Sequence, residues 1–562
     1  MSEEYTNFLS EKRLELGPWQ AFERGLARML SHVGFKDVKV VNGSGDKGAD
    51  IVGIRGNELW VVQAKYRSHG SIGISAIEEA LNAMKEYNTD VCVTATNRFF
   101  SREAQEFNRK KRNQTNVKSY LWNKNDILNY SKKLPFESKN RRISRKYQIK
   151  AIEKLNSAVD NGSNRGLITL ATGLGKTMVA SSFISNFIEE NPKANILVLA
   201  HMVDLVLQLD QASWPQFNSE VMTHIWTGVE KPSFYEGVVF ATWQSVLRAL
   251  DDGLIRSDYY DLIIVDECHH APSQSFTKLL KKLKPSFLLG VTATPWRGDE
   301  ISLRPLFGNP LFSMSVVEGM QKGFLSKVDY RMLTDGIDWD EISFLSKNGN
   351  TVKDLNANLY IPERDRGMVD EIVENMKLLS NPRVLVFCRS IKHAERLLNF
   401  FRIYDVKTAV LHSDIDRINR FKTLSGFRIG KISVLISVDM LNEGIDVPEV
   451  NMVCFARVTH SRRIFLQQLG RGLRLSDNKK IVKVLDFVAD IRRVAEGFEM
   501  NREASKFGGQ EIVNYPEGDI VKFSGDTSNF FNQYLKDMAN ISDLNENAQL
   551  LEYPPESKSF DD

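Results

Sequence analysis

The stretch at residues 166–177, which reads GLITLATGLGKT, limits what this chain can fold into more than any other feature. Apolar residues before the glycines predict a strand, and an apolar-periodic segment after them predicts a helix. Glycines at 173 and 175 allow a turn whose backbone N–H groups point at phosphate oxygens, next to the positive end of the helix. Leu170 stands where such loops usually have their first glycine. An ordinary strand-to-helix turn therefore remains an alternative for an isolated match.

Polar side chains around this turn fit a nucleotide and its metal ion. Lys176 adds a mobile positive charge, and the hydroxyl of Thr177 is a ligand for Mg²⁺. We expect ATP and Mg²⁺ as cofactors, with Thr177 in contact with both. The residues that we expect around the phosphates are Thr172, Gly173, Gly175, Lys176 and Thr177.

A second buried strand, at residues 262–265, ends in two adjacent acids. The carboxyl end of a strand in a parallel sheet is where such folds bind their ligands. We expect Asp266 to hold Mg²⁺ and Glu267 to align the water that attacks the γ-phosphate. A purely structural role for these two acids is a weak alternative, because burying unpaired carboxylates at a strand end costs free energy unless a cation is bound. A further strand, at 287–291, leads into Thr292 and the sequence TATP.

Two other segments carry groups suited to a nucleotide. The amide of Gln148 can donate and accept in one plane, which matches an adenine edge. Tyr147 could stack on a base or pack against the helix that follows. Near the other end, Arg471 and Arg474 share one helical face with Gln467, and two such arginines can clamp a γ-phosphate. Solvated surface charge is the alternative for both arginines.

The motifs ATGLGKT, DECHH and TATP, in this order and spacing, resemble motifs I, II and III of the superfamily 2 helicases, in particular their DECH-box members. RKYQ resembles the adenine-reading motif of that family, and MLNEGIDVP and QQLGRGLR resemble its motifs V and VI. The resemblance covers about residues 145–495, and it implies two RecA-like domains. It also implies that Gly444 and Asp446 contact nucleotide, that Ser437 and Arg389 contact nucleic-acid phosphates, and that Arg471 and Arg474 are arginine fingers.

Four residues near the start of the chain can meet at one point. Asp50 begins one predicted strand, and Gln63 and Lys65 stand two apart on the next, so that their side chains share a face. Glu23 approaches from a helix that an apolar face at 22–30 predicts. Oxygen ligands from Asp50 and Gln63 suit Mg²⁺, and the Lys65 ammonium can orient a water that attacks phosphorus. In the alternative, Asp50 caps a turn, Lys65 is solvated, and the domain only binds DNA.

The segments FERGLARMLSHVGF, GSGDKGADIVGI and VVQAKY resemble the Mrr-type branch of the restriction-endonuclease-like, or PD-(D/E)xK, nucleases. In that family the matching positions Asp50, Gln63 and Lys65 form a metal-dependent cleavage site, with Glu23 as an accessory acid. Gln63 replaces the usual acid of the ExK pair, and some members of the branch carry QxK as their normal form. We therefore expect a variant of the site.

Charge is unevenly distributed along the 562 residues, although the net charge is only +3. Between Arg98 and Lys150 there are 16 Lys or Arg residues and four acids. This block fits a nucleic-acid backbone as partner or a solvated linker equally well. No apolar run reaches the roughly 18 residues that a membrane span needs. Because the four cysteines are far apart and no secretory signal is present, we expect a cytoplasmic protein without membrane contact.

These patterns predict an α/β chain with two tandem RecA-like parallel-sheet domains preceded by a restriction-endonuclease-like α/β domain. The expected divisions are residues 1–135 (nuclease-like), 136–330 and 331–500 (RecA-like domains 1 and 2), and 501–562, an acidic tail with 12 acids against five bases. Residues 331–380 suggest only an irregular connector.

The combination predicts an ATP-dependent DNA translocase or helicase fused to a Mg²⁺-dependent DNA endonuclease. Such fusions resemble motor-plus-nuclease subunits of restriction and phage-defence systems. Duplex or single-stranded DNA is the expected partner, and a separate protein that specifies the target or belongs to the defence system is a further one. A repair or recombination helicase whose N-terminal domain binds without cleaving is the first alternative. An RNA helicase is the second.

Overall fold

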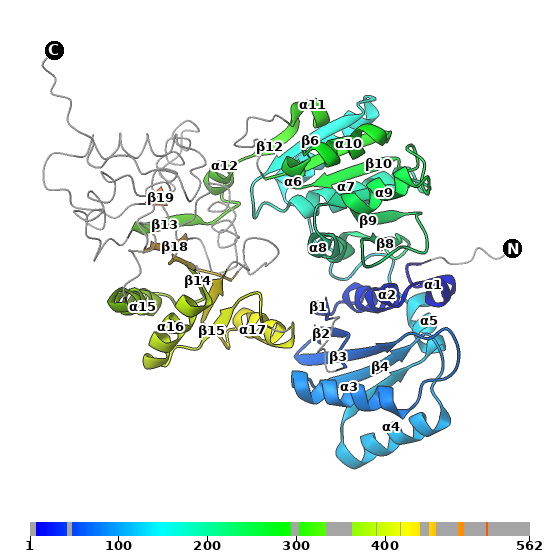
Figure 1. Ribbon diagram of the computed structural model, residues 1–562, viewed down its shortest axis with the longest axis horizontal. Coiled ribbons are helices and arrows are strands. Elements are labelled where there is room, and N and C mark those ends of the chain that lie inside the picture. The colour runs from blue at the N-terminus through cyan, green and yellow to red at the C-terminus, as the bar shows by residue number, and fades with distance from the viewer. Residues whose placement is uncertain are drawn as a thin grey trace, which may run out of the picture. The chain divides into compact units, whose positions relative to one another are not determined.

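The computed structural model describes residues 7–41, 48–271, 273–293, 303–332, 362–388, 390–415, 417–438, 449–456, 481–487 and 513–514. These residues fall into two compact units (Figure 1). The first takes in the chain up to Leu170 and Gly175–Ser313, and the second takes in Ala171–Leu174 and most of the chain after Met314. The four divisions expected from the sequence stay a prediction.

The N-terminal domain is a five-stranded sheet in the order β1-β2-β3-β4-β5. The β1–β2 and β2–β3 pairs are antiparallel, whereas β3, β4 and β5 are parallel. Its elements are α1 (Glu11–Leu16), α2 (Trp19–His32), β1 (Lys36–Val40), β2 (Ile51–Arg55), β3 (Glu58–Lys65), α3 (Ile74–Tyr87), β4 (Val91–Thr96), α4 (Arg102–Thr115), β5 (Lys118–Trp122) and α5 (Lys124–Lys132).

Helices cover this sheet because its strands are apolar on both faces. Helix α2 packs Phe22, Leu26 and Leu30 into a core with Trp60 and other residues of β3 and β4. Helices α3 and α4 contribute Ile77 and Ala104 to a separate cluster. The apolar period at 22–30 thus identified a real buried helix face.

The first unit also contains a seven-stranded sheet in the order β12-β6-β11-β10-β7-β9-β8. Every pairing that the described residues define among β6 to β11 is parallel. Its elements are α6 (Lys146–Asp160), β6 (Arg165–Leu170), α7 (Lys176–Glu190), β7 (Ile196–Ala200), α8 (Val203–Ser213), η1 (Trp214–Gln216), β8 (Thr223–Trp226), β9 (Val238–Thr242), α9 (Trp243–Asp251), β10 (Leu262–Asp266), η2 (Cys268–His270), α10 (Gln274–Lys282), β11 (Phe287–Thr292), α11 (Arg304–Phe307) and β12 (Pro310–Met314).

The second unit contains another seven-stranded sheet, in the order β15-β16-β14-β17-β18-β13-β19, and its strand pairs are parallel. Its elements are α12 (Val316–Gln321), β13 (Lys327–Met332), α15 (Pro362–Lys377), β14 (Val384–Cys388), α16 (Ile391–Ile403), β15 (Thr408–Leu411), α17 (Arg417–Ile429), β16 (Val434–Val438), β17 (Met452–Phe455), β18 (Ile481–Asp486) and β19 (Val513–Asn514).

These three sheets confirm the expected α/β fold class. The central strands β7, β9, β14 and β16 are buried along their whole length. That burial is why they read as continuous apolar runs. One expectation was wrong: residues 362–377 form helix α15 rather than an irregular connector. Its Val369 and Ile372 are buried in the core of the second unit.

The N-terminal domain docks on the neighbouring domain of the same unit through two arginines of α2, the buried Arg28 and the partly buried Arg24. Arg24 of α2 makes two hydrogen bonds of 2.5 Å to the carboxylate of Glu230, and its Nε lies 3.9 Å from Asp210 of α8. Arg28 donates to the carbonyl oxygens of Val221 (2.7 Å) and Asn218 (3.0 Å). These contacts hold the two domains of this unit to one another.

Burial shifts the pKa values of several side chains at this contact between the two domains. The Arg28 guanidinium lies 4.0 Å from the centroid of the Phe8 ring, and burial lowers the pKa of Arg28 to about 9. Arg13 of α1 donates to the carbonyl oxygen of Thr223, beside His224, whose pKa burial lowers to about 2. At neutral pH the arginines stay charged and the histidine stays neutral.

Replacing Glu230 by glutamine is expected to destabilise the first unit by about 3 kcal/mol, because it leaves Arg24 buried with a more distant acid only. Thermal or denaturant unfolding of the full chain measures this loss. Glu58→Gln is the matched control, because Glu58 forms an exposed pair with Lys118. Loss of such a solvent-screened pair should change the free energy of unfolding far less than loss of the Arg24–Glu230 pair. Equal effects of the two substitutions would contradict a structural role for the buried pair.

The connector between the two domains of the first unit, around Asn140 and Arg142, is held to both domains by hydrogen bonds. The side-chain amide of Asn140 donates to the carbonyl oxygens of Ser31 and Phe35, and the backbone N–H of Arg142 donates to Gln216. A purely solvated linker therefore does not describe these residues. All four cysteines are buried and none forms a disulfide. Among the described residues, no helix combines the length and the apolar character that a membrane crossing requires.

Candidate active sites

The glycine-rich turn lies between β6 and α7, as expected. Gly173 and Gly175 have φ angles of 89° and 81°. These values are in the left-handed region that favours glycine. A Cβ atom on Gly175 would lie 2.5 Å from Nε2 of Gln148, so the side chain of that glutamine and the turn fit together only without one. Helix α7 begins at Lys176, which places its N–H groups at the turn.

Gln148 is buried at the start of α6, where its Oε1 accepts the backbone N–H of Arg145 at 2.8 Å. Its amide nitrogen lies against the glycine-rich turn, as an adenine reader beside a phosphate loop requires. Tyr147 is buried as well, which favours packing over base stacking for that ring. The adenine contact itself stays a prediction.

Two acids at the end of β10 face the turn. Oε1 of Glu267 lies 2.6 Å from Nζ of Lys176. Burial and, to a smaller extent, the adjacent charge of Glu267 raise the pKa of Asp266 to about 7. Glu267 also has an unusual backbone, with φ 45° and ψ 49°. A non-glycine residue adopts this conformation at some energetic cost and mostly at functional sites. The structure thus brings together Lys176, Asp266 and Glu267.

A polar chain leads from Glu267 to the next strand. Nδ1 of His269 lies 3.3 Å from Oε2 of Glu267 and 3.0 Å from Oγ1 of Thr292, at the end of β11. Thr292 in turn stands beside Thr169 of β6 in the sheet register. The sequence placed DECHH and TATP at neighbouring strand ends but assigned no role to His269.

The residues of this site fit a divalent cation bound to a nucleotide. Asp266 and Glu267 are adjacent carboxylates that repel one another. A cation of charge two would therefore lower the electrostatic energy of the pair. Thr177, the second residue of α7, supplies a hydroxyl at the same turn. Carboxylate and hydroxyl oxygens are the ligands that Mg²⁺ prefers.

Several expected residues lie outside the described part of the chain. They are Thr294, Arg389, Gly444, Asp446, Arg471 and Arg474. Their nucleotide or nucleic-acid contacts stay predictions. Ser437, which the family resemblance implies for contact with nucleic-acid phosphates, is buried on β16.

The second site lies where β2 begins in the N-terminal domain. Oδ2 of Asp50 accepts hydrogen bonds from Nε2 of Gln63 (2.7 Å) and from the backbone N–H of Ala64 (2.6 Å). Both side chains are buried, and Oε1 of Gln63 has no hydrogen-bond partner among the described residues. A buried oxygen in this position is costly to leave unpaired, and a bound cation would satisfy it. Asp50 and Gln63 therefore fit a metal ion, with one charged and one neutral ligand.

Lys65 and Glu23 complete the expected set only in part. Lys65 ends β3, two residues after Gln63, and its Nζ lies 2.5 Å from Oε2 of Glu79 on α3. Glu23 is buried on α2, and its place at the metal stays a prediction. Glu79 was missed from the sequence, where it is one acid among several on an amphipathic helix. Among the described residues, no three His, Cys, Asp or Glu side chains are grouped as metal ligands.

Comparison with protein families assigns each segment. The family of the res subunit of type III restriction enzymes matches residues 142–297, and the conserved C-terminal domain of helicases matches residues 367–476. The catalytic domain of the Mrr restriction endonuclease family matches residues 15–130. The chain thus combines a domain of the type III restriction res-subunit family and a helicase C-terminal domain with a preceding Mrr-type restriction-endonuclease domain. The family resemblance expected from the motifs is confirmed.

Curated relatives of this chain include restriction and translocase proteins. The endonuclease subunit of the type I restriction enzyme EcoAI from Escherichia coli is 27% identical over 385 residues, which are 61% of this chain and 46% of that subunit. The DNA 3'-5' translocase XPB2 of Sulfurisphaera tokodaii is 24% identical over 355 residues, 57% of this chain and 76% of that protein. The chain thus spans about half the length of the restriction subunit that it matches.

A solved structure shares the fold over most of the chain. The ATP-dependent Type ISP restriction-modification enzyme LlaBIII bound to DNA superposes with a TM-score of 0.53 at 17% identity, over 93% of this chain and 41% of that one. At this identity the likeness concerns the fold alone. It extends across the endonuclease domain as well as the helicase domains of the present chain.

Proposed function

We propose that this protein hydrolyses ATP to move along DNA and cleaves DNA with its N-terminal domain, in restriction of foreign DNA. One observation carries the proposal: a single compact unit holds both the Lys176–Glu267 site and the Asp50–Gln63 site, and arginines of α2 join the two domains that carry them. The type I restriction subunit among its relatives supports the setting in restriction and phage defence.

For ATP hydrolysis, each residue has a role that its position supports. The turn at Gly173 and Gly175 binds phosphates through backbone N–H groups, and Lys176 neutralises their charge. Glu267 accepts hydrogen bonds from a water and aligns it for attack, while Asp266 and Thr177 hold Mg²⁺. Mg²⁺ held by Asp266 and Thr177 would offset the negative charge that develops on the phosphate oxygens. Arg471 and Arg474 would stabilise the same charge, and Gln148, Gly444 and Asp446 would contact the nucleotide.

In DNA cleavage, a water would attack the phosphorus of the scissile phosphate at the Asp50 site. Asp50 and Gln63 would hold Mg²⁺ through two oxygens, with Glu23 as an accessory acid. The ion would make a bound water more acidic and polarise the scissile phosphate. Lys65 would orient the water after its ion pair with Glu79 has opened or after the substrate has bound beside that pair. A partner protein that selects the target site fits this arrangement.

DNA should stimulate the ATPase of the purified full chain at least about tenfold, because a translocase couples its nucleotide cycle to the strand that it grips. Steady-state ATP hydrolysis with Mg²⁺ measures this stimulation for single-stranded DNA, duplex DNA and RNA in parallel. Lys176→Ala supplies the background. Stimulation by RNA alone would favour an RNA helicase, and no stimulation by any nucleic acid would contradict a motor.

A further inference from the structure

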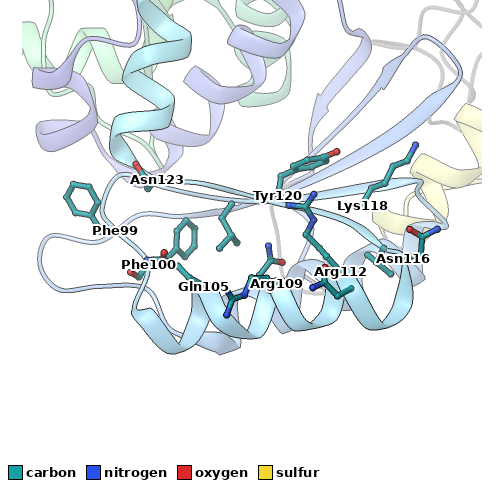
Figure 2. Close-up of a pocket in the computed structure, with 13 residues that line it drawn as sticks. Phe99, Phe100, Gln105, Arg109, Arg112, Asn116, Lys118, Tyr120 and Asn123 are labelled. Carbon is teal, nitrogen blue, oxygen red and sulfur yellow. Dashed lines mark hydrogen bonds between the residues drawn. The ribbon is translucent and has the colours of Figure 1, made fainter.

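A groove in the N-terminal domain is not used by either site described above. It runs between helix α4 and strand β5, the edge strand of the five-stranded sheet, and has a volume of about 680 Å³ (Figure 2). Pockets of this size enclose a molecule of one or a few rings. The groove is therefore too small for a duplex and large enough for part of a single strand.

The lining of this groove has the chemistry of a nucleic-acid site. Arg109, Arg112 and Lys118 line it, together with five Asn or Gln side chains, and no Asp or Glu does. Figure 2 shows Arg112 reaching from α4 toward the strand that carries Lys118 and Tyr120, with Arg109 three residues earlier on the same helix. Within the described part of the chain, neither arginine forms an ion pair, whereas Lys118 pairs with Glu58. Two uncompensated guanidinium groups in an acid-free groove favour an anionic ligand.

Aromatic rings at the groove point to exposed bases. Phe99 is 51% exposed, and no ring of the described residues stacks on it. The next residue, Phe100, is buried in the α3 and α4 cluster and fixes the backbone beside it. The Tyr120 ring stacks on Trp60, with centroids 6.1 Å apart, and its centroid lies 5.1 Å from the guanidinium carbon of Arg112, so Phe99 is the ring left open to a base. Exposed aromatic rings, arginines and amides together bind bases by stacking and by their edges, which a duplex keeps covered.

The groove adjoins the cleavage site along the sheet. Phe99 follows β4 by three residues, and β4 ends at Thr96, which is in register with Lys65 of β3. Adjacent strands lie about 4.8 Å apart, so the β5 edge is about 10 Å from β3. A strand held in the groove would thus leave it close to the carboxyl end of β3, where Lys65 lies.

We propose that this groove binds an unpaired DNA strand, with a base stacked on Phe99 and phosphates on Arg109 and Arg112. The inference rests on the proposed function and specifies the form of DNA that the endonuclease domain holds. Strand separation by the motor would supply that form. The groove would keep the separated strand beside the Asp50 site.

Photocrosslinking of the full chain tests this inference without cleavage. A single-stranded oligonucleotide that carries 5-iododeoxyuridine is bound in the presence of EDTA and without ATP, irradiated, and the adducts are mapped by peptide mass spectrometry. We expect adducts at Phe99 or Tyr120 in addition to those in the helicase domains. Stacking and phosphate contacts predict that Phe99→Ala, and separately the pair Arg109→Ala and Arg112→Ala, lower the groove adducts roughly tenfold or more.

The matched control removes two positive charges from the same helix outside the groove. Arg102 and Lys110 are exposed on α4 and do not line it, so the pair Arg102→Ala and Lys110→Ala should change groove adducts less than about twofold. Equal losses in both double variants, adducts confined to the helicase domains, or displacement by duplex DNA as readily as by single strands would each overturn the proposal.

Cleavage measured separately distinguishes this inference from the proposed function. If groove adducts form but the protein never cuts DNA, the groove binds a single strand and the proposed nuclease activity is wrong. If the protein cuts DNA without groove adducts, the nuclease activity stands and the proposed binding groove is wrong.

Discussion

Replacing Glu267 by glutamine is expected to lower the DNA-stimulated ATPase turnover about 10³-fold and to leave ATP affinity within about threefold. Positioned general bases contribute roughly 10²–10⁴ to a rate, and glutamine keeps the shape but cannot accept the proton of the attacking water. The carboxylate lies 2.6 Å from Lys176, at the phosphate end of the site. Loss of its charge also lowers the pKa of Asp266, which helps Asp266 remain ionised for the metal.

Turnover by a coupled ATPase assay and affinity by a fluorescent ATP analogue measure the two quantities. Asp251→Asn is the control, because Asp251 of α9 forms an exposed pair with Lys282 of α10. It should change turnover less than about twofold. A loss of less than about tenfold in Glu267→Gln would mean that another group aligns the water, and His269, 3.3 Å from the carboxylate, would be the first residue to examine.

Replacing Asp50 by asparagine is expected to lower the rate of DNA cleavage by about 10³-fold or more while the ATPase stays within about twofold. Metal-assisted attack supplies several kcal/mol, and each ~1.36 kcal/mol is a factor of ten in rate. The substituted amide would leave Gln63 and the backbone N–H of Ala64 in place but would offer the cation no negative charge. Since the ATP site lies in the neighbouring domain, the rate of ATP hydrolysis should not fall with the rate of DNA cleavage.

Plasmid nicking and linearisation with Mg²⁺ and ATP measure this effect. Asp90→Asn is the matched control, because Asp90 accepts a backbone N–H at the opposite end of β3 and asparagine can do the same. It should cut at the rate of the unchanged protein. If Asp50→Asn and the unchanged protein nick DNA equally slowly, the domain binds without cleaving, as in the repair-helicase alternative.

Local patterns in the sequence predicted much of the fold. The helix expected from the apolar face at 22–30 is α2 in the structure, because its apolar residues recur at helical spacing. The strands that end in the glycine-rich turn and in Asp266 were also predictable, since a strand buried on both faces reads as a continuous apolar run. The chemistry of the ATP site follows from where such strands end.

Long-range polar contacts were not predictable in the same way. The pairs Lys65–Glu79 and Arg24–Glu230 join residues 14 and 206 positions apart, and nothing in the local sequence separates these acids from solvated ones. Helix α15 was missed because the charged residues in PERDRGMVDEIVENMK obscure its apolar face. Its Met368, Val369, Ile372 and Met376 do follow a helical period, and that signal could have found it.

The central claim is that ATP hydrolysis in the helicase domains drives DNA cleavage in the N-terminal domain. The most direct measurement is cleavage of supercoiled plasmid by the unchanged full chain with Mg²⁺, in parallel with ATP, with a non-hydrolysable ATP analogue and without nucleotide. We predict rapid cleavage only in the condition with Mg²⁺ and ATP. Cleavage in that condition should be lost in both Lys176→Ala and Asp50→Asn. Cleavage at the same rate in all three conditions, or in Lys176→Ala, would contradict the coupling.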